Sequence, residues 1–114
     1  MIQGTWSFKP ATIKDEVEAL DEVITQVAGY TGISKKLIKG DDRTPKVAEA
    51  RRLYAYIASD VIKAKQATIA QHVGYADHTT ISYLVRTTKR DMAKIERVYT
   101  DVNNVRTLVI NALR

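Results

Sequence analysis

Cysteine is missing from this 114-residue sequence, which excludes disulfide bonds, thiolate metal sites and cysteine nucleophiles. Long apolar runs are also missing, because no stretch approaches the roughly 20 residues that a membrane-spanning helix needs. The first residues lack the basic region and the apolar region of a secretory signal peptide. We therefore expect a cytoplasmic protein with no membrane partner.

The motifs of common enzyme classes are absent as well. The two histidines, His72 and His78, match neither H-x-x-x-H nor H-E-x-x-H, the patterns of zinc sites on helices. No G-x-x-x-x-G-K-[ST] phosphate-binding loop occurs, and the five glycines are scattered along the chain. We therefore predict that the protein is not an enzyme, with no catalytic residues, no metal, no cofactor and no small-molecule substrate.

Negative charge is concentrated in the first 32 residues. That stretch holds two lysines and five acidic residues, a balance of −3, whereas the whole chain carries +5 with a pI near 9.5. The remainder therefore carries +8, since 5 minus −3 is 8. A basic body behind an acidic first segment is the charge pattern expected of a polyanion binder.

Apolar residues recur at spacings of three and four, the period of amphipathic helices, and no segment alternates for long enough to predict a strand. We expect one domain, an all-α, compact bundle of five to six helices. Its expected parts are an N-terminal arm with the start of an acidic helix (1–22), a helix-turn-helix region (23–98) and a C-terminal helix packed on the same domain (99–114). Helices are expected over about 12–28, 34–39, 45–62, 66–73, 77–99 and 101–113.

Glycine, threonine and proline mark the expected helix ends. Gly29, Gly40 and Gly74 are predicted to end helices. Thr44 is predicted to be the N-cap of another helix, with Pro45 as its first residue. The side chains predicted to face the core are Ile13, Val17, Leu20, Ile24, Val27, Val47, Leu53 or Tyr54, Ile57, Val61, Ile69, Val73, Ile81, Leu84 or Val85, Thr88, Met92, Ile95, Val102, Val105, Leu108 or Val109, and Ala112.

The stretch from Gly74 to Ile81 has the pattern of a helix-turn-helix. Gly74 suits a left-handed helix end, and Asp77 suits the cap of the next helix. Capping explains Asp77 but not the polar run His78-Thr79-Thr80, because threonine is a mediocre helix former. The first turn of a recognition helix explains the run, since its side chains point at base edges in the major groove.

Three segments resemble the C-terminal DNA-binding domain (domain IV) of the bacterial chromosomal replication initiator DnaA, here in a stand-alone small protein. They are the tract 45–52, the helix 69–74 and the core Asp77-His78-Thr79-Thr80-Ile81. The resemblance covers about residues 23–98. It implies a TrpR/DnaA-like helix-turn-helix that reads a DnaA-box-like duplex through both grooves.

Site residues follow from this resemblance and from the basic residues beside the motif. Asp77, His78, Thr79 and Thr80 are expected in the major groove, and Arg43 in the minor groove. The expected phosphate contacts are Arg51, Arg52, Lys63, Lys65, Gln66, Tyr83, Arg86 and Lys89.

The sequence departs from the family pattern at three places. Ala67 follows Lys65 and Gln66 where the family has a Leu-Pro pair, Thr87 replaces a lysine, and Ala76 replaces a frequent arginine. These departures predict that phosphate contacts are weaker than base contacts.

We therefore expect a sequence-specific, nucleoid-associated binder of double-stranded DNA that regulates replication or transcription. The alternative is a protein-interaction module of the same fold that docks a partner through the acidic helix 12–28. The sequence leaves open a homodimer or a protein partner on the N- or C-terminal helix.

Overall fold

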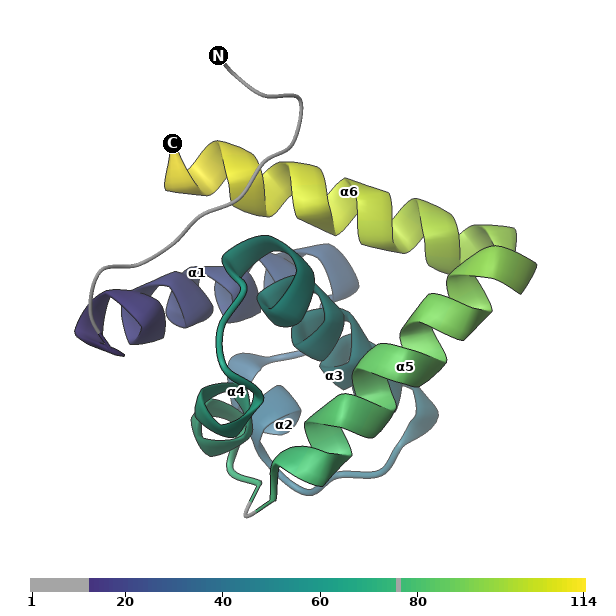
Figure 1. Ribbon diagram of the computed structural model, residues 1–114. Coiled ribbons are helices and arrows are strands. Elements are labelled where there is room, and N and C mark those ends of the chain that lie inside the picture. The colour runs from purple at the N-terminus through teal and green to yellow at the C-terminus, as the bar shows by residue number, and fades with distance from the viewer. Residues whose placement is uncertain (1–12, 76) are drawn as a thin grey trace.

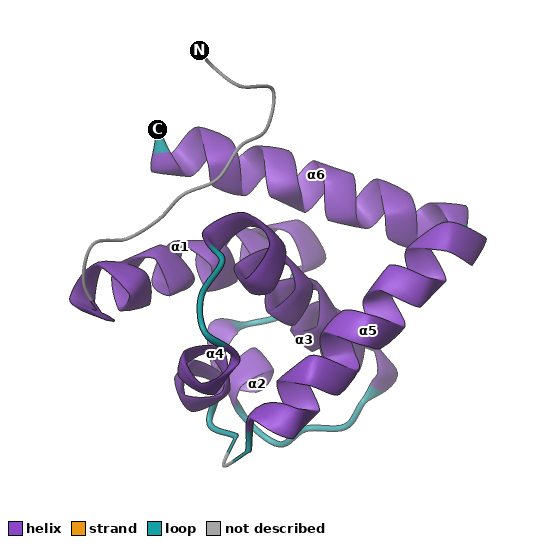
Figure 2. Cartoon of the chain, in the orientation of Figure 1, coloured by secondary structure: helices purple, strands orange, loops and turns teal. Residues whose placement is uncertain are grey.

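The computed structural model describes residues 13–75 and 77–114 (Figure 1). Over these residues it contains six α-helices, one π-helical turn and no strand, which confirms the predicted all-α fold (Figure 2). The predicted N-terminal arm, residues 1–12, lies outside the described residues. The elements are α1 (Ile13–Thr31), α2 (Lys35–Lys39), α3 (Pro45–Ile57), the π-turn η1 (Ala58–Ile62), α4 (Gln66–Val73), α5 (His78–Lys94) and α6 (Glu96–Leu113).

The helices pack around a central α3. Helices α1 and α6 lie side by side on one side of α3, and α5 crosses it on another (Figure 1). The short α2 and α4 lie together at the end of the molecule where α5 begins. Each helix contributes apolar side chains to one core, and Tyr54 is the largest of its fully buried side chains. None of the described helices is long and apolar enough to cross a bilayer.

Most of the predicted core is buried, with corrections near the ends of helices. Val17 is 37% exposed and Ile95 43% exposed, so the prediction was wrong for both. The buried stripe of α1 is centred nearer Val23, which places Val17 at its edge, and Ile95 lies outside any helix in extended backbone. Ala112, in the last turn of α6, is also exposed.

Helix α1 ends later than the sequence predicts. It passes through Gly29 and stops at Thr31, and the left-handed residue is Gly32, with φ 77°. The N–H of Gly32 donates to the carbonyl of Ala28 at 2.9 Å, which satisfies one of the last carbonyls of the helix. Gly29 needs no special backbone conformation, and a glycine inside a helix costs only about 1 kcal/mol relative to alanine.

Helix α5 ends earlier than predicted, at Lys94, without glycine or proline to mark the break. Ile95 is extended (φ −122°, ψ 110°), and its N–H donates to the carbonyl of Asp91 at 2.7 Å. The break turns α6 back over α1, where Arg97 bonds Glu49 of α3 at 2.6 Å. Packing of α6, rather than local propensity, therefore sets this boundary.

Three further predicted helix ends are confirmed, at Ser34, Gly40 and Pro45. Two others are wrong: the helix predicted over 45–62 becomes a π-turn after Ile57, and α6 begins at Glu96 rather than near Asp101. Ser34 caps α2 by accepting a hydrogen bond from the Leu37 N–H at 3.2 Å, and Gly40 ends that helix. Pro45 is the first residue of α3 after Thr44, although the hydroxyl of Thr44 makes no capping bond to α3.

Candidate nucleic-acid interface

The turn between α4 and α5 needs a glycine at position 74 for two reasons. Gly74 has φ 88°, which a residue with a Cβ adopts only with strain. A Cβ added there would also lie 3.1 Å from the carbonyl oxygen of Lys39. The second contact shows that the helix-turn-helix turn lies directly against the end of α2.

Asp77 is the N-cap of α5, as predicted. Its Oδ1 accepts hydrogen bonds from the Thr79 N–H at 2.9 Å and from the Thr79 hydroxyl at 2.8 Å. Both bonds lower the pKa of the Asp77 carboxyl because they stabilise its ionised form, and the bond from the backbone N–H has the larger effect. The side chains of His78, Thr79 and Thr80 are exposed, while Ile81 behind them is fully buried. The first turn therefore presents three polar side chains to solvent, on a helix that Ile81 fixes to the core.

The depressed pKa gives a signed prediction for pH. An aspartate whose folded pKa lies below its unfolded value stabilises the fold fully above the unfolded pKa and loses this contribution as pH falls through the folded pKa. We expect carbon NMR to show the Asp77 carboxyl titrating below the ordinary 3.8. Thr79→Ala, which removes the hydroxyl bond, should raise that midpoint. A midpoint at or above 3.8 in the unaltered protein would contradict the hydrogen-bonded cap.

The outward face of α5 carries further residues of the predicted set. Tyr83 is 55% exposed, and the guanidinium carbon of Arg86 lies 6.0 Å from the centre of its ring. Lys89 is also exposed. Thr87 is buried, and its hydroxyl donates to the carbonyl of Leu84 at 3.2 Å. The departure from the family at position 87 therefore points into the body of the protein.

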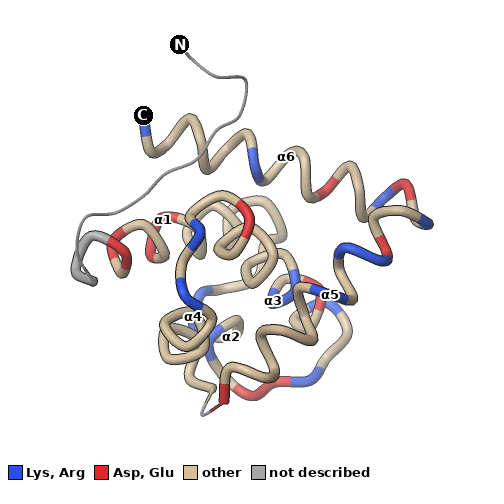
Figure 3. The backbone as a smooth tube through the Cα atoms, in the orientation of Figure 1, with Lys and Arg blue, Asp and Glu red and all other residues tan. Residues whose placement is uncertain are grey.

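The connector before α4 places three predicted residues close together in the chain. Lys63 has a left-handed backbone (φ 62°) that ends the π-turn, and its side chain is exposed. Lys65 is exposed at the N-cap position of α4, and Gln66 follows as a half-buried first residue. Figure 3 shows this basic connector beside α4, separate from the acidic start of α1.

Arg43 is exposed in the loop between α2 and α3. Asp42, beside it, accepts a 2.7 Å hydrogen bond from the Thr44 N–H and a second bond from the Thr44 hydroxyl. These bonds lower the pKa of the Asp42 carboxyl. The residues on both sides of Arg43 are therefore tied to each other, while its own side chain faces solvent.

Arg51 lies elsewhere than the resemblance implies. The prediction was a phosphate contact, but the side chain is only 7% exposed. Its guanidinium donates to four backbone carbonyls between residues 37 and 42, at distances of 2.8 to 3.0 Å. A buried guanidinium with these partners is not placed to reach a phosphate, so Arg51 does not belong to the outer surface.

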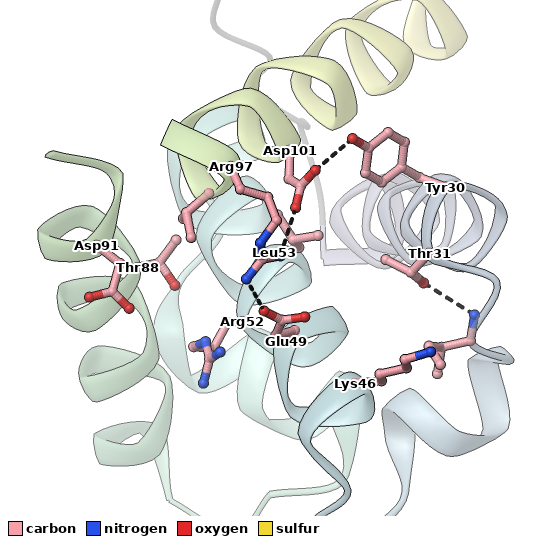
Figure 4. A pocket seen from close by; sticks show the side chains of 12 residues that line it. Tyr30, Thr31, Lys46, Glu49, Arg52, Leu53, Thr88, Asp91, Arg97 and Asp101 are labelled. Carbon is pink, nitrogen blue, oxygen red and sulfur yellow. Dashed lines mark hydrogen bonds and ion pairs between the residues drawn. The ribbon is translucent and has the colours of Figure 1, made fainter. Parts of the chain in front are cut away.

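Arg52 lies apart from the other predicted phosphate contacts. It faces a cavity of about 250 Å³ between α1, α3, α5 and α6 (Figure 4). Arg97 of α6 bonds Glu49 of α3 across this cavity and Asp101 one turn along its own helix. Asp101 also accepts a 2.7 Å hydrogen bond from Tyr30 of α1. The cavity therefore marks where α6 is tied to α1 and α3.

A chain of hydrogen bonds that the sequence did not predict holds α4 in place. The hydroxyl of buried Tyr54 lies 2.6 Å from Nδ1 of His72, and Nε2 of His72 lies 2.6 Å from Oδ1 of Asp21. Burial raises the pKa of Tyr54, so Tyr54 keeps its proton and can donate to His72. These bonds join α3, α4 and α1. No local motif signals them, because the partners are 18 and 51 residues apart.

Comparisons with known proteins identify the family of this chain. The family described as bacterial dnaA protein helix-turn-helix matches residues 20–88. The chromosomal replication initiator protein DnaA of Aliarcobacter butzleri is 29% identical over 98% of this chain, and that of Campylobacter fetus is 28% identical over 72%. The chain spans 25% and 20% of the lengths of these two relatives.

A crystal structure of a DNA replication initiation factor has the same fold. It aligns with a TM-score of 0.71 over 82% of this chain and 30% of that one, at 23% sequence identity. The family match covers more than half of the chain and includes α2 to α4 and the first turns of α5. The chain belongs to the bacterial DnaA helix-turn-helix family.

Proposed function

We propose that this chain binds double-stranded DNA at a DnaA-box-like site and acts as a regulator of replication or transcription. The first turn of α5 carries the proposal. It presents His78, Thr79 and Thr80 to solvent behind the Asp77 cap, on the second helix of a helix-turn-helix. In such motifs the start of the second helix contacts base edges in the major groove.

The chemistry of these side chains suits base reading. The Asp77 carboxylate can accept a hydrogen bond from the amino group of cytosine, and a threonine methyl can pack on the methyl of thymine. Asp77 uses Oδ1 for capping, and Oδ2 has no hydrogen-bond partner among the described residues. The exposed Arg43 is proposed to enter the minor groove from the loop beside this turn.

Basic and polar side chains of α5 and of the connector before α4 are the proposed phosphate contacts. Residues 33–114 carry a net charge of +8, which favours a polyanionic partner. The proposed contacts are Lys63, Lys65, Gln66, Tyr83, Arg86 and Lys89; Arg52, which lines the cavity beside α6, is not counted with them.

A titration tests the proposal. A labelled duplex with a DnaA-box sequence and a scrambled duplex of the same composition are titrated at several salt concentrations, with fluorescence anisotropy as the readout. We expect tighter binding to the box duplex. Four lysine and arginine contacts would give a slope of log affinity against log salt of about −3 to −4. Lys65→Ala should weaken both duplexes alike and reduce the slope by about 0.9.

The same titration decides between this proposal and a protein-interaction module. Weak, salt-sensitive and equal binding to both duplexes would contradict sequence-specific recognition. The acidic residues of α1 are the surface of the alternative, and Glu18 is exposed there. Asp21 is already engaged by His72, which leaves less of this acidic face free for a partner.

A further inference from the structure

We infer that Arg51 is a positioning residue that fixes the Asp41–Thr44 loop, and thus Arg43, relative to the helix-turn-helix turn. The inference rests on the proposed function, because it explains how Arg43 is held in position for the proposed minor-groove contact. Arg51 itself touches no DNA in this assignment. It acts from α3, beneath the surface that Arg43 and the start of α5 share.

The first observation is that Arg51 completes the end of α2. Its Nε donates to the carbonyl of Ile38 at 2.8 Å, and its Nη2 donates to the carbonyl of Leu37 at 2.9 Å. Both carbonyls belong to the last turn of a five-residue helix, where carbonyls lack partners within the helix and carry the negative end of its dipole. These backbone oxygen atoms replace the water that the buried, positively charged guanidinium has lost.

The same guanidinium extends into the loop. Nη2 also donates to the carbonyl of Gly40 at 2.9 Å, and Nη1 donates to the carbonyl of Asp42 at 3.0 Å. Asp42 in turn holds the N–H and the hydroxyl of Thr44. Arg43 lies between these two residues, so a continuous set of hydrogen bonds runs from α3 to the backbone that carries its side chain.

Arg51 also contacts the helix-turn-helix turn. Its guanidinium carbon lies 6.0 Å from the centre of the ring of Tyr75, a distance that allows a cation–π contact. The next residue back, Gly74, approaches the carbonyl of Lys39 closely. The end of α2, the Arg43 loop and the turn before α5 therefore meet at one side chain. Their relative positions depend on its planar, five-donor geometry, which lysine lacks.

Binding to duplexes with single base-pair substitutions tests this role. Each duplex carries one substituted base pair and is titrated with the unaltered protein and with three variants, Arg43→Ala, Asp77→Ser and Arg51→Lys. Base pairs whose penalty disappears in Arg43→Ala define the Arg43 footprint, and Asp77→Ser defines the Asp77 footprint in the same way. We expect Arg51→Lys to lose the Arg43 footprint, to within about twofold of Arg43→Ala, and to keep the Asp77 footprint.

Three further variants make the result specific. The double variant Arg43→Ala/Arg51→Lys should bind like Arg51→Lys alone. Asp42→Ala, a change in the loop that leaves the core intact, should reproduce the loss even if Arg51→Lys does not fold. Arg106→Lys is the matched control, because Arg106 is a half-buried arginine of α6 that bonds Asp60 and Asn103. Equal loss of both footprints in Arg51→Lys would overturn the inference. So would a double variant in which Arg43→Ala weakens binding as much as it does in the unaltered protein.

A second readout needs no DNA and separates the two proposals. If the unaltered protein shows no footprint at all, the proposed function fails. The amide of Thr44 should still exchange with solvent at least about tenfold faster in Arg51→Lys than in Arg106→Lys, because its acceptor Asp42 is no longer held. Equal exchange rates in the two variants would overturn the positioning role of Arg51, whatever the DNA experiments show.

Discussion

Replacement of Asp77 by serine should remove most of the preference for a box duplex while leaving α5 capped. Serine is as good an N-cap as aspartate, but its hydroxyl is too short and too weak an acceptor to replace the carboxylate at a base edge. One lost specific contact corresponds to about 1–3 kcal/mol, or roughly 5- to 150-fold in the ratio of the two affinities. Affinity for the scrambled duplex should stay the same or rise, because a carboxylate near phosphates repels them.

Asp77→Ala separates the two roles of this residue. It should lose the same selectivity as Asp77→Ser and, in addition, about 1 kcal/mol of stability from the missing cap. Thermal unfolding followed by circular dichroism should therefore show a lower Tm for Asp77→Ala than for Asp77→Ser. If Asp77→Ser keeps the selectivity of the unaltered protein, Asp77 is a cap and reads no base.

Replacement of His72 by leucine should cost about 1–3 kcal/mol of stability, because it leaves the buried hydroxyl of Tyr54 without its acceptor. The variant also loses the bond from His72 to Asp21 and the stacking of its ring on Tyr54, whose centroids are 5.6 Å apart. A change of 1 kcal/mol lowers the Tm of a domain of this size by about 4 °C.

A double-mutant cycle isolates the hydrogen bond. Tyr54→Phe/His72→Leu removes both the donor and its acceptor, so it should recover part of the stability that His72→Leu loses. Asp21→Asn tests the exposed end of the chain and should cost less than about 1 kcal/mol. Urea and thermal unfolding of the unaltered protein, Tyr54→Phe, His72→Leu and the double variant give the coupling energy directly. An unchanged Tm in His72→Leu would show that these bonds contribute nothing to stability.

The parts of the fold that could be predicted from the sequence are those set by local chemistry. The Ser34 and Asp77 caps, Pro45 at the start of α3 and Gly74 at the end of α4 each act within a few residues, so the sequence around them was sufficient. The break at Ile95 has no such signal. A break was expected between residues 99 and 101, about five residues too late, because its position depends on where α6 packs.

The candidate site shows the same division. The polar first turn of α5 could be predicted because its exposed residues are adjacent in sequence. The burial of Arg51 could not, since its four acceptors lie 9 to 14 residues earlier and become neighbours only after α2 packs on α3. A helical arginine next to half-buried Arg52 looks like a surface residue until those carbonyls are in place.

The dependence of α2 on α3 also bears on the order in which the protein folds. Isolated helices shorter than about 12 residues are marginal in water, and α2 has five. The Arg51 guanidinium bonds the carbonyls of its last turn only once α3 has packed against it. We therefore expect the loop that carries Arg43 to be among the last segments to acquire a fixed shape, because its hydrogen bonds to Arg51 need α3 to be in place first.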